Sequence, residues 1–105
     1  MPRVSVVVPA YAAARFIAAT LDSVAAQTYR DFEVVVVDDG SPDETKLIVD
    51  GWLSKTGVPG ICMRRPNGRI AAARNTGLRL AKGNLIALLD HDYFWTPDKL
   101  ALTVA

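Results

Sequence analysis

The chain has 105 residues, enough for one compact domain and too few for two. Half of the residues are hydrophobic and 22% are charged, a composition that excludes an intrinsically disordered chain. Twelve Lys and Arg oppose eleven Asp and Glu, and a net charge of +1 excludes a general electrostatic surface for nucleic acid. The single cysteine, Cys62, excludes an internal disulfide and a multi-cysteine zinc site, and we expect it in the core.

Short apolar runs predict the strands. The runs 4–8, 32–37 and 85–89 are apolar on successive positions and rich in Val, Ile and Leu, as in parallel strands that are covered on both faces. A weaker run, 61–63, lies between turn residues and is predicted as a further strand. No run approaches the length of a signal-peptide core or a membrane span, so we expect a cytoplasmic protein.

Helical patterns lie between these runs. Apolar residues repeat at helical spacing within 13–27, which predicts an amphipathic helix there. Ser41 and Glu44 have the spacing of a capping box, which predicts that a second helix begins directly after Ser41. The third predicted helix, 69–82, contains small residues that allow close approach to a sheet, and it ends before Gly83.

The alternation of strands and helices predicts a three-layer, doubly wound α/β fold with a mainly parallel sheet, formed by one domain that spans 1–105. In such folds ligands bind outside the carboxyl ends of the strands. Three segments are expected at that edge, which are 9–11, 38–40 and 90–92.

Carboxylates gather at this edge. Asp38 and Asp39 follow one buried strand, and Asp90 and Asp92 follow another. We expect these strands to be neighbours, so that four carboxylates converge and hold a divalent cation. Oxygen ligands favour Mg²⁺ or Mn²⁺ over zinc. For one such pair alone, a solvated strand end remains the alternative.

A basic stretch complements these acids. Residues 64–82 carry six basic side chains and no acid. Arg69 and Arg74 lie near the start of the predicted third helix, where free amides and the helix dipole favour an anion such as a diphosphate. The chain lacks the glycine motifs of phosphate-binding loops and dinucleotide sites. Three further charges are interpreted as solvated: Arg64, Arg79 and Lys82.

Several motifs occur in a familiar order along nearly the whole chain. They include Val4–Tyr11, Phe32–Asp43, Ala73–Gly77 and Leu89–Asp92. Each motif is weak alone, but their order and spacing resemble the family 2 nucleotide-sugar glycosyltransferases, which have the Rossmann-like GT-A fold. The resemblance implies an enzyme that transfers a sugar from a nucleotide-diphosphate donor to an acceptor hydroxyl.

The resemblance also implies a role for each matching residue. Pro9, Tyr11 and Asp39 correspond to the nucleotide base pocket, where the acid contacts the base edge. The position of Arg74 approaches the diphosphate in this family. Asp90 corresponds to the ribose-binding acid of the DxD motif.

The metal and the catalytic base are implied in the same way. Asp92 corresponds to the ligand of Mn²⁺ or Mg²⁺, with Asp90 as a second candidate. The family's catalytic base and acceptor site lie beyond the position of Ala105, so we expect this chain to be a truncated, donor-binding half without activity of its own. The usual Asn after the tyrosine is Ala12 here.

The expected partners follow from the resemblance. They are a UDP-sugar donor and a saccharide or lipid-linked acceptor, with no nucleic acid. We expect a homodimer that forms through the C-terminal segment, and a cytoplasmic location with the inner face of a membrane as a second possibility. A binding-only nucleotide module and a receiver-like signalling domain are the alternatives.

Overall fold

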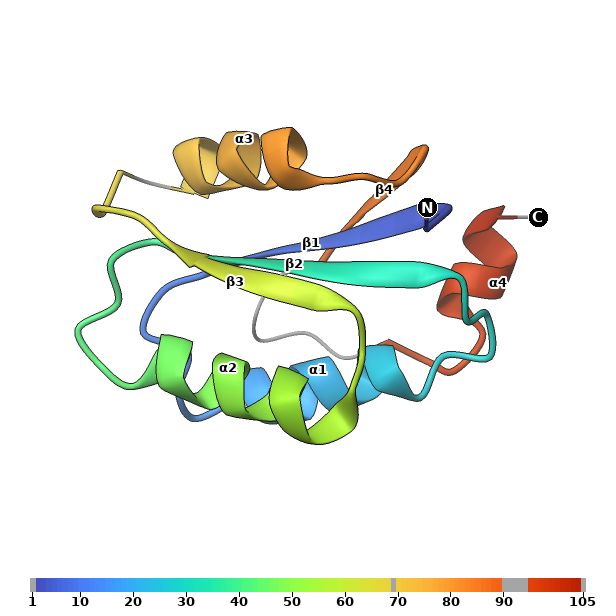
Figure 1. Cartoon of the computed structure of the whole chain (residues 1–105), viewed down its shortest axis with the longest axis horizontal. Helices are drawn as coiled ribbons and strands as arrows, with labels where there is room; N and C mark the ends of the chain where they lie inside the picture. Colours follow the sequence, from blue (N-terminus) through green and yellow to red (C-terminus); the bar gives the residue numbers. More distant parts are fainter. Residues whose placement is uncertain (1, 69, 90–94, 105) are drawn as a thin grey trace.

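The computed structural model describes residues 2–68, 70–89 and 95–104. Strands and helices alternate along the chain, as predicted (Figure 1). The elements are β1 (Val4–Ala10), α1 (Ile17–Ala25), β2 (Phe32–Asp38), α2 (Thr45–Thr56), β3 (Gly60–Arg64), α3 (Ile70–Leu80), β4 (Leu85–Leu88) and α4 (Lys99–Val104).

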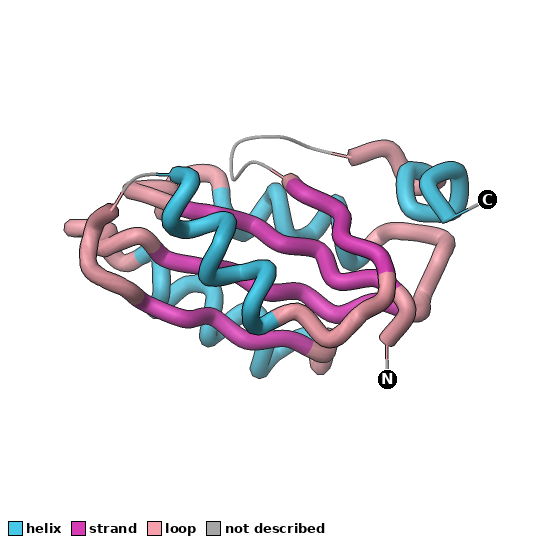
Figure 2. The backbone as a smooth tube through the Cα atoms, turned by 90° about the horizontal axis from the view of Figure 1, so that it is seen from above, coloured by secondary structure: helices cyan, strands magenta, loops and turns pink. Residues whose placement is uncertain are grey.

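The four strands form one parallel sheet in the order β3-β2-β1-β4. Helix α3 covers one face, and α1 and α2 cover the other (Figure 1). Seen from above, α3 lies across the middle of the sheet (Figure 2). The predicted three-layer α/β fold is therefore confirmed. The expectation that the strands before the two acid pairs are neighbours is wrong, because β1 lies between β2 and β4.

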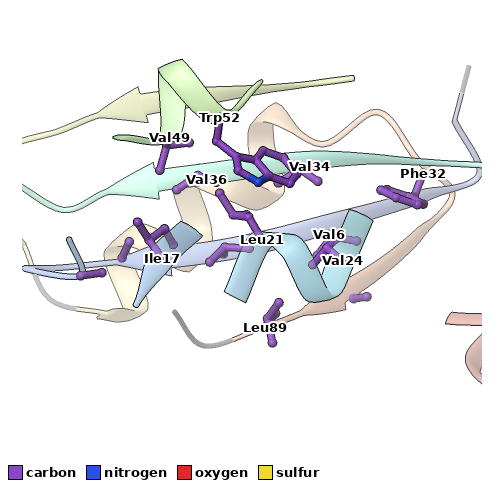
Figure 3. Packing of buried hydrophobic residues seen from close by; sticks show 14 of the residues in the cluster. Val6, Ile17, Leu21, Val24, Phe32, Val34, Val36, Val49, Trp52 and Leu89 are labelled. Carbon is purple, nitrogen blue, oxygen red and sulfur yellow. The ribbon is translucent and has the colours of Figure 1, made fainter. Parts of the chain in front are cut away.

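The main hydrophobic core lies between the sheet and helices α1 and α2 (Figure 3). All seven residues of β1 and all seven of β2 are buried, as expected for central strands with apolar side chains on both faces. Leu21 and Trp52 bring the two helices into the same cluster. A smaller cluster of Val7, Val35, Val37 and Ala73 fills the space under α3.

A glycine allows α3 to approach the sheet closely. A Cβ atom at Gly77 would lie 2.4 Å from Cγ1 of Val7, which leaves no room for a side chain. The prediction that small residues on this helix permit close approach is therefore confirmed at Gly77.

The first two helices begin later than predicted. Helix α1 starts at Ile17, and α2 starts at Thr45 rather than after Ser41. The Ser41 hydroxyl does not cap α2, because its Oγ accepts a hydrogen bond from the Ala12 amide at 2.9 Å. Likewise, Thr45 Oγ1 accepts the Ala13 amide at 2.9 Å. These polar side chains hold the turn after β1 in place.

A buried polar network closes the amino end of the sheet. Glu33, 8% exposed, accepts two hydrogen bonds at Oε2, from Ser5 Oγ at 2.6 Å and from the Lys82 amide at 2.7 Å. The Gly83 amide donates to Ser5 Oγ at 2.7 Å. The network fixes the connection between α3, which ends at Leu80, and β4.

Gln27, which follows α1, holds the C-terminal segment. Its Oε1 accepts the Leu100 amide at 2.9 Å, and the Leu100 side chain is fully buried. Trp95 and Val104 pack against the main core, and Leu102 is 70% exposed. Of these four side chains, Leu102 is therefore the one that is left largely exposed.

Candidate functional site

The loops after β1, β2 and β3 meet at the carboxyl edge of the sheet. The Asp39 amide donates to the Ala10 carbonyl at 2.8 Å, and the Arg65 amide donates to the Asp38 carbonyl at 2.9 Å. Backbone pairing therefore continues past the strand ends and fixes the loops relative to one another. Tyr11 directly follows Ala10, and its side chain is 46% exposed at this edge.

Asp38 is a structural carboxylate. It is fully buried, and its Oδ1 accepts the Ser41 amide at 3.0 Å. Its Oδ2 lies 3.4 Å from Nη1 of Arg64, whose Nη2 donates to the Ser41 carbonyl at 2.8 Å. A buried carboxylate requires such compensation. The interpretation of Arg64 as a merely solvated charge is therefore wrong.

Asp39 joins the β2 loop to the loop before α3. It is 5% exposed, and its Oδ1 accepts the Gly68 amide at 3.0 Å and lies 3.4 Å from Nε of Arg65. Gly40 has a φ of +72°, and a Cβ there would lie 2.7 Å from the Asn67 amide nitrogen. The residue at this turn must therefore be glycine. The two loops form one packed unit.

The strand order does not support the cluster of four carboxylates that the sequence predicted. Arg64 and Arg65 compensate Asp38 and Asp39, and two strand spacings of about 4.8 Å separate β2 from β4. Within residues 2–68, 70–89 and 95–104, no three His, Cys, Asp or Glu side chains are placed to hold a metal ion. The predicted metal ligands Asp90 and Asp92 lie outside the described residues, as does His91.

The structure brings three of the predicted base-pocket residues to one edge. Pro9 is buried and pairs in register with Val37, next to the pair Ala10 and Asp38. Tyr11 directly follows β1, and Asp39 directly follows the adjacent strand β2. Arg74 lies half-buried at the beginning of the second turn of α3, after the loop that Asp39 holds. Arg69 lies outside the described residues.

The sequence interpretation missed Arg65 and Gly68. Both contact Asp39. One signal was available, because a basic pair follows the weak strand as an acidic pair follows the preceding strand. If these strands are neighbours, the pairs must meet at the same edge.

Cys62 has no reactive character. It lies half-buried on β3 against the main core, as predicted. Burial raises the pKa of its thiol from 9.0 to about 12, because desolvation disfavours the thiolate. The thiol therefore stays protonated at neutral pH, which disfavours a nucleophilic role for this residue.

A doubly wound parallel sheet with polar loops joined at its carboxyl edge defines an α/β protein with a candidate ligand site at that edge. The family model described as Glycosyl transferase family 2 matches residues 5–105, and the chain belongs to this family. The receiver-like alternative is therefore wrong. An uncharacterized glycosyltransferase of Rickettsia prowazekii is 37% identical over 94% of the chain, and chondroitin synthase of Pasteurella multocida is 38% identical over 97%.

Solved structures give the same result. S. aureus TarS matches with a TM-score of 0.89 and 32% identity over 97% of the chain. The mannosyltransferase PcManGT from Pyrobaculum calidifontis, in complex with GDP-Man and Mn²⁺, matches with a TM-score of 0.92 and 39% identity over 98%. The GT-A fold is thereby confirmed. The chain spans 31% of both structures, 30% of the Rickettsia protein and 10% of chondroitin synthase.

Proposed function

We propose that this chain is the donor-binding part of a family 2 glycosyltransferase and binds a UDP-sugar at the carboxyl edge of the sheet. The observation that carries the proposal is the position of Asp39, which the Ala10 carbonyl and the Gly68 amide hold between two loops. Two relatives support the ligand class, since TarS was solved with UDP-GlcNAc and PcManGT with GDP-Man.

The base pocket is assigned to residues that follow β1 and β2. The exposed ring of Tyr11 offers a surface on which a base or ribose stacks. Asp39 supplies a carboxylate oxygen to the N–H donor of a uracil-type base. Pro9 closes the pocket at the end of β1, where the backbone already pairs with β2.

The diphosphate and the metal are assigned to the other side of this edge. Arg74 contributes a guanidinium from α3 to the diphosphate, and Asp90 accepts hydrogen bonds from the ribose. Asp92, with Asp90 as a second candidate, holds a divalent ion, Mn²⁺ or Mg²⁺, which neutralises the diphosphate that leaves. Asp38 and Asp39 take no part in metal binding, because arginines already compensate them.

The whole reaction is transfer of the sugar to the hydroxyl of a saccharide or lipid-linked acceptor. The catalytic base that removes the hydroxyl proton is assigned to chain outside 1–105. The domain 1–105 supplies the donor site alone.

Calorimetric titration with UDP, GDP and uridine, with and without Mn²⁺, tests the proposal. UDP should bind more tightly than GDP and require metal, and Arg74→Ala should weaken UDP binding about tenfold while leaving uridine binding unchanged. Arg3→Ala, which removes an exposed arginine at the amino end, is the matched control. Absence of UDP binding would refute the proposed function, and unchanged metal dependence in Asp92→Asn would refute the metal assignment.

Association with a second copy or with a membrane surface stays a prediction. No helix in the described part of the chain has the length and apolar character needed to cross a membrane. Apolar side chains at β4 are available for association, with Leu85 36%, Ile86 39% and Leu88 50% exposed. Light scattering over a range of concentrations should detect a dimer, and a monomer throughout that range would refute it.

A further inference from the structure

We propose that the groove between the end of β3 and helix α3 is a second anion site, which binds the phosphate group of a phosphomonoester. The groove has a volume of about 400 Å³. Arg64, Arg65, Arg79 and Thr76 supply its polar lining, and Met63 and Leu80 belong to its apolar part. It lies at the β3 edge of the sheet, and β4, which precedes Asp90, forms the other edge.

Two guanidinium groups from different elements converge in this groove. Nη1 of Arg65 lies 3.0 Å from Oγ1 of Thr76, and Nη2 of Arg79 lies 3.3 Å from the same atom. The Thr76 hydroxyl donates its own hydrogen to the Ala72 carbonyl at 3.0 Å, so its oxygen faces the arginines as an acceptor. Two cations that share one neutral oxygen repel one another, and an anion between them removes that repulsion.

Arg79 has no acid in the groove to neutralise its charge. The lining contains no carboxylate, and neither does the sequence 64–82. Arg64 and Arg65 face Asp38 and Asp39 at the sheet edge. Arg79 makes no ion pair within the described residues. The groove therefore retains an excess positive charge on the side of Arg79.

A phosphate group fits this arrangement better than a single carboxylate. Its oxygens accept from guanidinium groups that approach from two directions, whereas one carboxylate is matched by one planar fork. The apolar side chains of Met63 and Leu80 provide contact for the carbon part of an ester. The ligand class is therefore a phosphomonoester, either in solution or as a lipid headgroup.

Arg79 is the residue to test, because Arg65 also lies beside Asp39 and its loss would disturb the proposed nucleotide site. In an NMR titration of the chain with glycerol phosphate, the Thr76 amide and the Arg79 Nε–H should shift and saturate. Arg79→Gln should weaken binding about tenfold, Arg79→Lys less, and Arg3→Gln not at all. The titration contains no nucleotide, so its outcome is independent of UDP binding.

Vesicles distinguish the two sources of the phosphate group. Phosphatidic acid in phosphatidylcholine vesicles is compared with the soluble ester at equal phosphate concentration. Arg79-dependent binding of the soluble ester assigns a free metabolite, and Arg79-dependent binding of the vesicles alone assigns a lipid headgroup. If neither binds, or if wild type and Arg79→Gln bind equally, the proposal is overturned.

Discussion

The two ends of the sheet treat buried carboxylates in different ways. At the amino end, Glu33 accepts hydrogen bonds from a serine hydroxyl and a backbone amide, both neutral donors. At the carboxyl end, Asp38 and Asp39 lie beside arginines at 3.4 Å, and exposed Tyr11 follows on the neighbouring strand. The hydrogen bonds of Glu33 fix the connection between α3 and β4. The acids and arginines at the carboxyl end instead place charged groups beside an exposed surface.

The two ends of the sheet have grooves of similar volume, so cavity size does not distinguish them. The groove beside Glu33 and Lys82 has a volume of about 470 Å³, and the groove beside Gly40 and Asn67 has about 500 Å³. The chemistry of the lining separates them, together with the rule that ligands of doubly wound sheets bind at the carboxyl ends. The comparison predicts that substitutions at the amino end act on stability, and that those at the carboxyl end act on binding.

The largest effect on stability should come from Glu33→Ala. The substitution leaves the Ser5 hydroxyl and the Lys82 amide without their acceptor in a buried place, at a cost of about 3 kcal/mol in the free energy of unfolding. Urea denaturation measures it, and Glu33→Gln, which keeps one acceptor oxygen, should lose less. A loss below about 1 kcal/mol for Glu33→Ala would show that the network does not stabilise the fold.

Gly83→Ala should destabilise by about 2 kcal/mol. Its Cβ would lie 2.7 Å from the Ser5 amide nitrogen, so the backbone of β1 or of the α3–β4 connection must shift. Gly51→Ala is the matched control, since nothing lies within 4 Å of its Cβ in the middle of α2. The control should stabilise by about 0.5–1 kcal/mol in the same denaturation assay. Equal effects of the two alanines would contradict the packing at Gly83.

Asp39→Asn should reduce nucleotide affinity more than it reduces the stability of the fold. The amide keeps an oxygen for the Gly68 amide, so the free energy of unfolding should fall by about 1 kcal/mol or less. Calorimetry should show UDP affinity reduced about tenfold, because a neutral amide is a weaker acceptor for the base. A variant that binds UDP normally would remove Asp39 from the proposed pocket.

A change in chemical reactivity, with no change in stability or affinity, is expected at Cys62, which lies on β3 between the two ends of the sheet. Burial raises the pKa of its thiol to about 12, so the thiol stays protonated well above neutral pH. Alkylation of the folded chain at pH 8 should be more than about tenfold slower than in urea, because the thiolate is the reactive form. Equal rates would show that this part of the sheet opens freely.

The strands could be predicted from the sequence because short Val-rich runs favour a buried strand over a helix or a loop. The run Phe32–Asp38 is apolar on both faces and is fully buried in the structure. Helix starts were harder, since the capping pattern at Ser41 is equally suited to hold another segment, which here is the turn at Ala12. Local sequence does not distinguish between these two uses of one hydroxyl.

Site prediction depended in the same way on strand order. The rule that ligands lie at carboxyl ends located Tyr11 and Asp39, since it needs only the end of each strand. The pairing of Asp39 with Arg65 and Gly68 requires that β3 lies beside β2, which no local pattern specifies. The same missing information produced the wrong expectation that the strands before the two acid pairs are neighbours.

The central claim is that nucleotide binds at the carboxyl end of the sheet. An NMR titration of the chain with UDP and Mg²⁺ tests it directly, because Mg²⁺ does not broaden the signals of nearby amides. We expect saturable shifts at the amides of Ala12, Asp39 and Gly68, with those of Ser5 and Gly83 unchanged. Shifts confined to Ser5, Gly83 and the groove beside Lys82 would contradict it.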